Sequence, residues 1–193
     1  MNRLNIFLLL VIFILLSFVR SDRASEKDFV EMKSQTFSPT PTPTPTTAPP
    51  VRFIIPKILV DAPVIPVSVD AEGKMELPPQ PADVGWYQLG VKPGEKGNAV
   101  VAGHLDSATG AGAIFGRLSE LVPGDAIIVT KEDNQQEIFE VVQKEIFPFD
   151  QVPIDMVFGE SEERNLNLIT CTGVFNQITS NYSHRMIIFA QKQ

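Results

Sequence analysis

The fold is indicated most clearly by one stretch near the C-terminal end of the chain, Leu166-Asn-Leu-Ile-Thr170-Cys171-Thr172-Gly173. Side chains of a β-strand alternate between two faces, so Leu166, Leu168 and Thr170 share one face and Cys171 lies on the other. The glycine that follows is typical of a loop. The stretch therefore predicts a strand that ends near Cys171 and holds its thiol rigidly at the mouth of a cleft.

Six other short apolar runs have the same character, because they are rich in Val, Ile and Phe and are bounded by Pro- and Gly-containing turns. They are Arg52–Ile55, Val64–Val69, Asn98–His104, Asp125–Thr130, Glu137–Phe147 and Arg185–Gln191. Only Phe115–Leu121 has the pattern of a helical turn. Seven or eight strands without a regular alternation of strand and helix predict an all-β barrel or sandwich.

Composition excludes several classes of protein. The 193 residues include 16 Lys and Arg against 23 Asp and Glu, for a net charge of −7. Nucleic acid is therefore not an expected partner, because phosphate binding needs a basic face. With 44% hydrophobic residues the chain has ample material for a core. A disulfide scaffold is excluded, since Cys171 is the only cysteine.

The N-terminal segment predicts attachment to a membrane. Leu4–Val19 is a run of 16 residues without a charge, which spans about 24 Å as a helix, against a hydrocarbon core of about 30 Å. A cleaved secretory signal peptide is the alternative, but no small-x-small cleavage pattern follows the run. We expect residues 1–20 to be an uncleaved signal-anchor that crosses the cell membrane once.

The composition of the next segment, residues 21–50, predicts a linker. Its last part, Pro39–Pro50, alternates proline with threonine over most of its length. This pattern blocks both helix and sheet, so it predicts an extended spacer of about 3.1 Å per residue. We expect residues 51–193 to form one domain, held at the extracellular side of the membrane.

Three side chains suggest chemistry in this domain. Cys171 is a potential nucleophile, although most lone cysteines are buried small hydrophobes. His104 ends an apolar run, and Gly103 beside it leaves room for a close approach. Arg185 is expected to face the site and His184 to face solvent, because neighbours in a strand point to opposite faces. The alternative for Arg185 is a surface ion pair. Together they would supply a thiolate, a proton-transfer group and a cation for an oxyanion.

The sequence resembles a known family, the sortases, which are membrane-anchored cysteine transpeptidases of mainly Gram-positive bacteria. The order and spacing of five motifs carry the resemblance: Ala102-Gly-His-Leu-Asp106, Phe115-Gly-Arg-Leu118, Gly124-Asp125, Leu168-Ile-Thr-Cys171 and Arg185-Met-Ile-Ile-Phe-Ala190. The motif around the cysteine is most similar to class E/F-like sortases, although Thr172 stands where a Gly is common there.

The resemblance implies a closed eight-stranded barrel with one or two short helices. It implies that Cys171 is the nucleophile, His104 the general acid/base and Arg185 the partner of the substrate carbonyl or oxyanion. The implied substrates are secreted proteins with a C-terminal Leu-Pro-x-Thr-Gly-like sorting signal, cleaved after Thr. The implied acceptor is an amine on peptidoglycan or a pilin. Thr170 is expected to support the oxyanion, and Asp106 is a secondary candidate for the site.

The connection from residue 148 to residue 164 is unusually apolar for a solvated loop. The resemblance implies that this connection forms the wall that receives the Leu and Pro of the sorting signal, and that Ile154, Val157 and Phe158 belong to this wall. The alternative is a loop folded back onto the barrel. No cofactor is implied, apart from Ca²⁺ as a weak candidate. The candidate ligands for Ca²⁺ are Glu160, Glu162 and Glu163. Such a run of acidic residues is also typical of a solvated surface patch.

Two other functions remain open on the sequence. One is an envelope cysteine peptidase or an L,D-transpeptidase-type enzyme, although the latter carry Ser-x-Gly-Cys at the thiol, where this chain has Ile169-Thr170-Cys171. The other is a tethered barrel that only binds peptides, with an inert thiol.

Overall fold

Short strands dominate residues 47–193, the part of the chain that the computed structural model describes. The strands are β1 (Pro50–Ile55), β2 (Val60–Val67), β3 (Val84–Tyr87), β4 (Gly97–Ala102), β5 (Ala126–Lys131), β6 (Gln136–Pro148), β7 (Arg164–Asn176) and β8 (Asn181–Lys192). Two 3₁₀ turns, η1 (Pro56–Ile58) and η2 (Leu118–Glu120), and one helix, α2 (Ile154–Phe158), connect them. The predicted anchor and most of the predicted linker lie outside the described residues.

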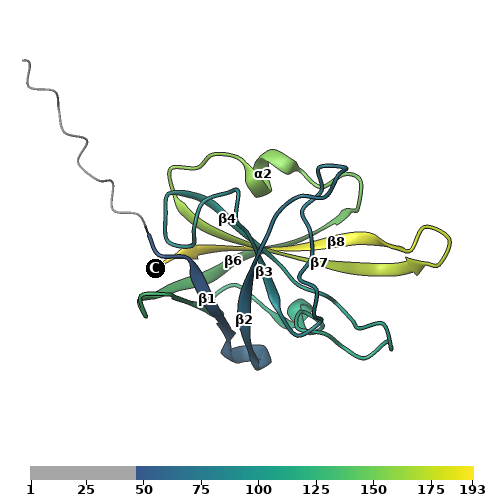
Figure 1. Cartoon of the computed structure of the whole chain (residues 1–193), viewed down its shortest axis with the longest axis horizontal. Coiled ribbons are helices and arrows are strands. Elements are labelled where there is room, and N and C mark those ends of the chain that lie inside the picture. The colour runs from purple at the N-terminus through teal and green to yellow at the C-terminus, as the bar shows by residue number, and fades with distance from the viewer. Residues whose placement is uncertain (1–46) are drawn as a thin grey trace, which may run out of the picture. The chain divides into compact units, whose positions relative to one another are not determined.

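The eight strands close into a barrel in the order β1-β2-β3-β4-β7-β8-β6-β5 (Figure 1). Most neighbours are antiparallel, but β2 pairs with β3 and β4 pairs with β7 in parallel. The predicted all-β, eight-stranded closed barrel is confirmed. Among residues 47–193, no helix is both long enough and apolar enough to span a membrane.

The barrel interior is filled by the inward faces of the strands, as the alternation predicted. Leu166 and Leu168 of β7 are fully buried, and so are Phe53 of β1 and Phe115 of the segment before η2, whose rings lie 6.1 Å apart.

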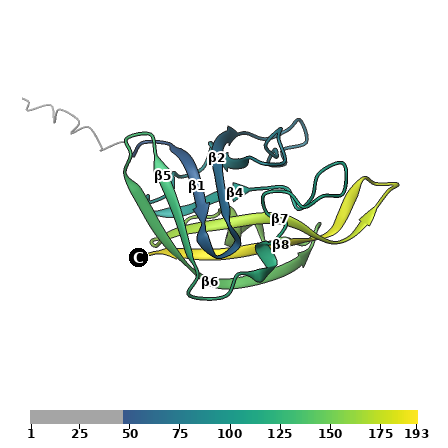
Figure 2. The same ribbon diagram turned by 90° about the horizontal axis from the view of Figure 1, so that it is seen from below.

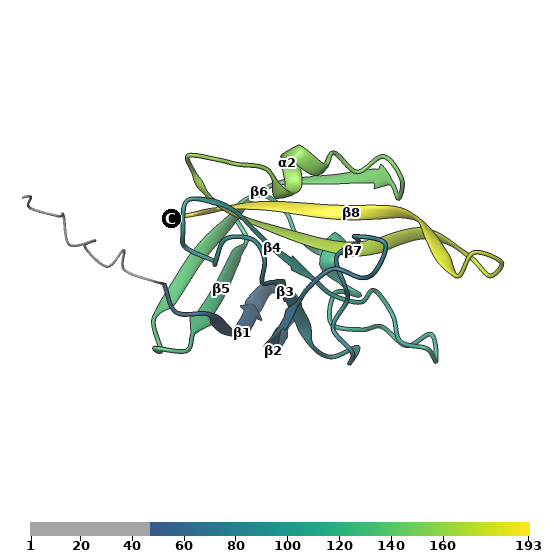
Figure 3. The ribbon, with the colours of Figure 1, turned by 45° about the horizontal axis from the view of Figure 1, so that its top comes forward.

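A second, smaller apolar cluster lies outside the barrel, where α2 packs on β4 and a residue of β8 joins the cluster (Figure 3). Its fully buried members are Val100, Val157 and Ile187. Two strand asparagines hold the end of the helix in place: Asn98 donates to the carbonyl of Gly159, and Asn167 to the carbonyl of Val157, both at 2.8 Å.

Strands β7 and β8 continue past the barrel as a two-stranded ribbon (Figures 1 and 2). The prediction that the strand ends near Cys171 is wrong, because β7 runs on to Asn176. Gly173 does not end the strand; it takes up a left-handed conformation (φ +86°) within an irregularity of the β7–β8 pairing. Cys171 therefore lies in the interior of a long strand.

Candidate active site

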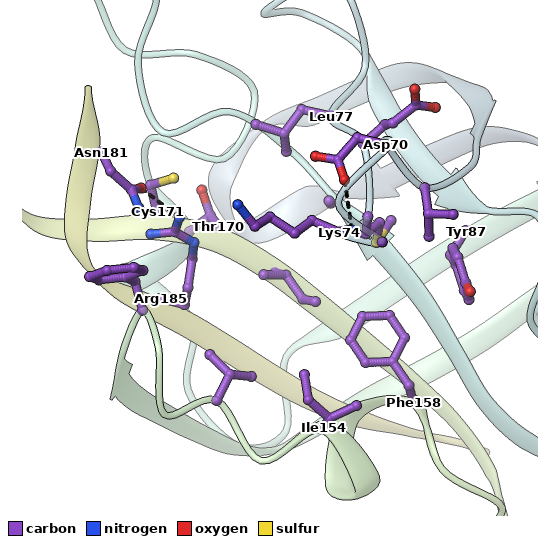
Figure 4. A pocket seen from close by; sticks show the side chains of 18 of the residues that line it. Asp70, Lys74, Leu77, Tyr87, Ile154, Phe158, Thr170, Cys171, Asn181 and Arg185 are labelled. Carbon is purple, nitrogen blue, oxygen red and sulfur yellow. Dashed lines mark hydrogen bonds between the residues drawn. The ribbon is translucent and has the colours of Figure 1, made fainter. Parts of the chain in front are cut away.

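An open cleft of about 800 Å³ lies where the end of β4, the middle of β7 and the start of β8 meet the loop between β2 and β3 and the segment that leads into α2. Its walls are mainly apolar and include Met75, Leu77, Tyr87, Val152, Ile154, Phe158 and Ile169. Cys171 and Arg185 lie together at one end of it (Figure 4). The cleft thus combines a peptide-sized apolar surface with a nucleophile and a cation.

Cys171 and Arg185 are direct partners across the antiparallel β7–β8 pair. Residues paired in this way project from the same face of a sheet, and Figure 4 shows the guanidinium turned toward the thiol. Arg185 lines the cleft and His184 does not, which agrees with the predicted strand face. His184 is half-buried, with its Nδ1 within 2.8 Å of the Ser183 hydroxyl, and so is less exposed than predicted.

Four contacts fix the Arg185 guanidinium. Its Nη2 donates to Oδ1 of Asn181 at 2.7 Å, and its Nη1 donates to the carbonyls of His184 and Tyr182 at 3.0 and 3.2 Å. The ring of Phe149 lies 6.0 Å from the guanidinium carbon. A cation held in this way loses little freedom when a negative oxygen forms beside it.

The half-buried thiol of Cys171 has opposing electrostatic neighbours. Burial raises its pKa above the ordinary value, the positive charge of Arg185 lowers it, and the carboxylate of Asp106 raises it. Burial is the largest of these effects, so the net shift is upward. At neutral pH the resting side chain is therefore the thiol, and a base must remove its proton before attack.

His104 follows the end of β4, where the parallel pairing with β7 brings Ala102 beside Ile169. The pairing extends one residue further, since the amide of Gly103 donates to the carbonyl of Ile169 at 3.1 Å. His104 is the next residue after this last contact with β7. The imidazole Nε2 donates to the carbonyl of Pro78 at 2.8 Å. The neutral ring therefore has Nδ1 as its proton acceptor.

The supporting candidates take different places. Thr170 is buried and its hydroxyl donates to the carbonyl of Gly103 at 2.9 Å, which ties β7 to the residue before His104. Asp106 accepts a hydrogen bond from the hydroxyl of Tyr182 at 2.5 Å. His104 and Asp106 are not among the residues that line the cleft.

Of the three residues predicted to form the apolar wall, all on α2, two line the cleft and one does not. Ile154 and Phe158 line the cleft, and the ring of Phe158 meets that of Tyr87 edge-on at 5.5 Å. Val157 does not line the cleft, because the helix turns it inward, where it is fully buried. It supports the wall from behind.

No three His, Cys, Asp or Glu side chains within residues 47–193 gather as a metal site would require. The acidic residues considered for Ca²⁺ do not form such a group: Glu162 pairs with Lys96 at 3.0 Å, and Glu163 accepts from Gln191 at 3.3 Å. Glu160 is exposed.

Sequence reasoning missed Asn181 and Tyr182, which contact Arg185 and Asp106. Their only signal was position, because they come a few residues before the arginine at the start of the same strand. The carbonyl of Pro78 carried no signal, since a backbone group has no mark in the sequence.

A closed eight-stranded barrel with a thiol and a guanidinium paired at the end of an apolar cleft defines a site suited to acyl transfer. The family model described as the sortase domain matches residues 53–193. The chain therefore belongs to the sortase family, whose members are cysteine transpeptidases.

Solved structures of sortases share the fold. Sortase C-1 from Actinomyces oris is 23% identical with a TM-score of 0.58, over 75% of this chain and 72% of that one. A lid mutant of sortase A from Corynebacterium diphtheriae is 20% identical with a TM-score of 0.58, over 78% and 74%. A sortase D5 transpeptidase from Clostridium perfringens is 20% identical with a TM-score of 0.56, over 75% and 79%. No curated protein matches the sequence closely enough to indicate a relative.

Proposed function

We propose that this chain is a membrane-anchored transpeptidase that cleaves a Leu-Pro-x-Thr-Gly-like sorting signal after Thr and transfers the acyl group to an amine. The observation that carries the proposal is the direct pairing of Cys171 with Arg185 at the end of the apolar cleft. The family provides the reaction class.

The residues suit the two halves of such a transfer. The Cys171 thiol gives its proton to His104, and the sulfur attacks the carbonyl carbon of the substrate Thr. Arg185 stabilises the oxyanion that forms. The C–N bond to Gly then breaks, and the imidazolium returns the proton to the leaving amine. A thioester remains on the sulfur. An incoming amine attacks this thioester, loses a proton to the imidazole and releases the thiolate.

The cleft suits the apolar part of the signal. Ile154 and Phe158 on one side and Met75 and Leu77 on the other offer a surface for the Leu and Pro side chains. Because Arg185 pairs with Cys171, the carbonyl of the substrate Thr would lie beside both residues at the same end of the cleft. The Leu168-Ile-Thr-Cys171 motif supports a class E/F-like member.

The proposed substrates are secreted proteins, and the proposed acceptor is an amine on peptidoglycan or a pilin. Residues 1–20 would anchor the enzyme in the cell membrane with the barrel outside the cell. The apolar run and the Pro/Thr spacer in the sequence support this placement.

The test is incubation of the full chain, in detergent micelles, with a Leu-Pro-x-Thr-Gly peptide and oligoglycine or a lysine-containing peptide. An amide-linked product is the expected result. Free acid as the only product would show the peptidase instead. No turnover, together with a thiol that resists a methanethiosulfonate reagent in the native protein, would show the peptide-binding barrel.

Matched variants locate the chemistry. Cys171→Ala should abolish the product, and His104→Ala and Arg185→Ala should lower it by about a hundredfold or more. His184→Ala is the control, because neighbours in a strand point to opposite faces, so this imidazole lies on the other face from Arg185, with its Nδ1 2.8 Å from the Ser183 hydroxyl. Its rate should stay within a few-fold of the parent, and a collapse there would contradict the assignment of His104.

A further inference from the structure

Two half-buried residues that line neither wall of the cleft connect the two sides of the candidate site. Asp106 lies two residues after His104, in the segment of residues 103–117, called here the His104 loop. Tyr182 lies on β8, three residues before Arg185. The Tyr182 hydroxyl donates to Oδ2 of Asp106 at 2.5 Å. This hydrogen bond, called here the clasp, joins the loop that follows His104 to the strand that carries Arg185.

Each partner in the clasp is held on its own side. The ring of Tyr182 packs against Phe175 of β7, with centroids 5.1 Å apart. In the His104 loop, Asp106 forms a bridge with Gly112, and the amide of Ala113 donates to the carbonyl of Leu105 at 3.0 Å. The loop is thus ordered internally, and the clasp fixes it to the β7–β8 ribbon.

The clasp lies within reach of the charges at the thiol. The carboxylate of Asp106 raises the pKa of Cys171 and, through the hydrogen bond, raises the pKa of Tyr182 to about 12. Tyr182 therefore keeps its proton, and remains the donor, at physiological pH. Arg185 faces the thiol from β8, and the other charged groups that line the cleft are Asp70, Lys74, Glu76 and Asp150.

We propose that Asp106 and Tyr182 are positioning residues, whose hydrogen bond holds His104 in register with Cys171 and Arg185 during acyl transfer. The inference rests on the proposed function. Gly103, the residue before His104, is tied to β7 through the carbonyl of Ile169, and the carbonyl of His104 accepts from the amide of Phe115 at 3.0 Å. The clasp adds a direct link from this loop to the start of β8, the strand that carries Arg185.

Conservative variants separate the hydrogen bond from the charge. Tyr182→Phe removes the hydroxyl and keeps the ring against Phe175. Asp106→Ala removes the acceptor, whereas Asp106→Asn keeps a carbonyl oxygen that accepts from Tyr182 and removes the charge. Asp61→Ala is the control, since it removes an exposed carboxylate that pairs with Arg52 between β1 and β2, away from the cleft.

Steady-state transfer by the full chain is the first measurement. Tyr182→Phe and Asp106→Ala should each lower kcat by about ten- to a hundredfold, with KM within about twofold. The double variant should be no slower than either single one. Asp106→Asn and Asp61→Ala should stay within a few-fold of the parent. Full activity of Tyr182→Phe, additive losses in the double variant, or equal losses in Asp106→Asn and Asp106→Ala would each overturn the proposal.

Hydrogen exchange of the His104 loop, followed by mass spectrometry, is the second measurement and needs no turnover. Exchange should rise in Tyr182→Phe and Asp106→Ala and stay at the parent level in Asp106→Asn. Unchanged exchange in Tyr182→Phe would overturn the clasp even if the parent enzyme is active. If the parent transfers no acyl group, the proposed function fails, and raised exchange would still show the clasp without a catalytic role for it.

Discussion

Cys171 and Arg185 face each other across the β7–β8 pair, so backbone hydrogen bonds of a sheet, and not a loop, set the spacing between the thiol and the guanidinium. Directly opposed residues of an antiparallel pair have Cβ atoms about 4.5–5.5 Å apart. The thiol and the guanidinium are therefore arranged side by side before any peptide binds, which in the proposed transfer would remove part of the cost of organising the transition state.

The first prediction concerns the shape of the cation at residue 185. Arg185→Lys keeps the charge but loses the forked contacts to Asn181 and to two backbone carbonyls. We expect kcat/KM for transfer to fall about a hundredfold, with a nearly unchanged melting temperature. Arg52→Lys is the control, because Arg52 forms an exposed pair with Asp61 on the far strands. An Arg185→Lys enzyme with parent activity would show that charge alone is needed.

The second prediction concerns the titration of Cys171. Burial raises its pKa and Arg185 lowers it, so the thiolate population should still be rising with pH at and above the ordinary thiol pKa. Labelling by a methanethiosulfonate reagent should accelerate over that range. Arg185→Gln should move the profile to higher pH, because the stabilising cation is removed, and Asp106→Asn should move it to lower pH. A plateau below pH 7 in the parent protein would contradict the assignment.

The third prediction concerns the glycine before His104. A Cβ at Gly103 would lie 2.5 Å from Cδ2 of Phe115 and 2.9 Å from a side-chain carbon of Ile114. Because Phe115 is fully buried in the barrel interior, Gly103→Ala should destabilise the fold by about 1–3 kcal/mol and displace His104, which lowers transfer. Chemical denaturation measures the first effect and peptide turnover the second.

The matched control lies in the same loop. A Cβ at Gly112 meets nothing within 4 Å, so Gly112→Ala should leave stability within about 0.5 kcal/mol of the parent. Equal losses of stability in Gly103→Ala and Gly112→Ala would contradict this prediction. They would show that the loop tolerates no side chain at either glycine, so that packing against Phe115 is not the reason.

The fourth prediction concerns the wall of the cleft. Val157 of α2 is fully buried, whereas Met156 on the same helix is 55% exposed. Val157→Ala should cost about 2 kcal/mol of stability and raise KM for the peptide, because Ile154 and Phe158 lose their support. Met156→Ala should change stability little. Thermal unfolding measures the stability of the two variants, and steady-state kinetics over a range of peptide concentrations measures KM. A destabilised Val157→Ala enzyme with an unchanged KM would contradict a role of α2 in substrate binding.

Alternation along the strands was the part of the site that the sequence made predictable. Reading every second residue separates Cys171 from Leu168 and Thr170, and Arg185 from His184. Cys171 and Arg185 line the cleft as this alternation predicts, but Thr170, from the other face, lines it too. The pairing of β7 with β8 could not be predicted in this way, because register between strands depends on the whole sheet. The clasp depends on the conformation of a loop and left no pattern in the sequence.

The errors at element ends have physical causes. A glycine at residue 173 predicts a loop, but a glycine with positive φ also fits an irregularity inside a strand. Strand β3 was missed because it has only four residues. Helix α2 lies in a connection that the sequence identified only as apolar, since five residues are too few to show a helical period.

The place of β8 has a consequence for synthesis of the protein. It is the last strand of the barrel in chain order, yet it lies between β6 and β7. The barrel therefore cannot close until residues 181–192 have been synthesised and have inserted between these two strands. Because Arg185 lies on this last strand, the thiol of Cys171 gains its guanidinium partner only in the step that completes the ring.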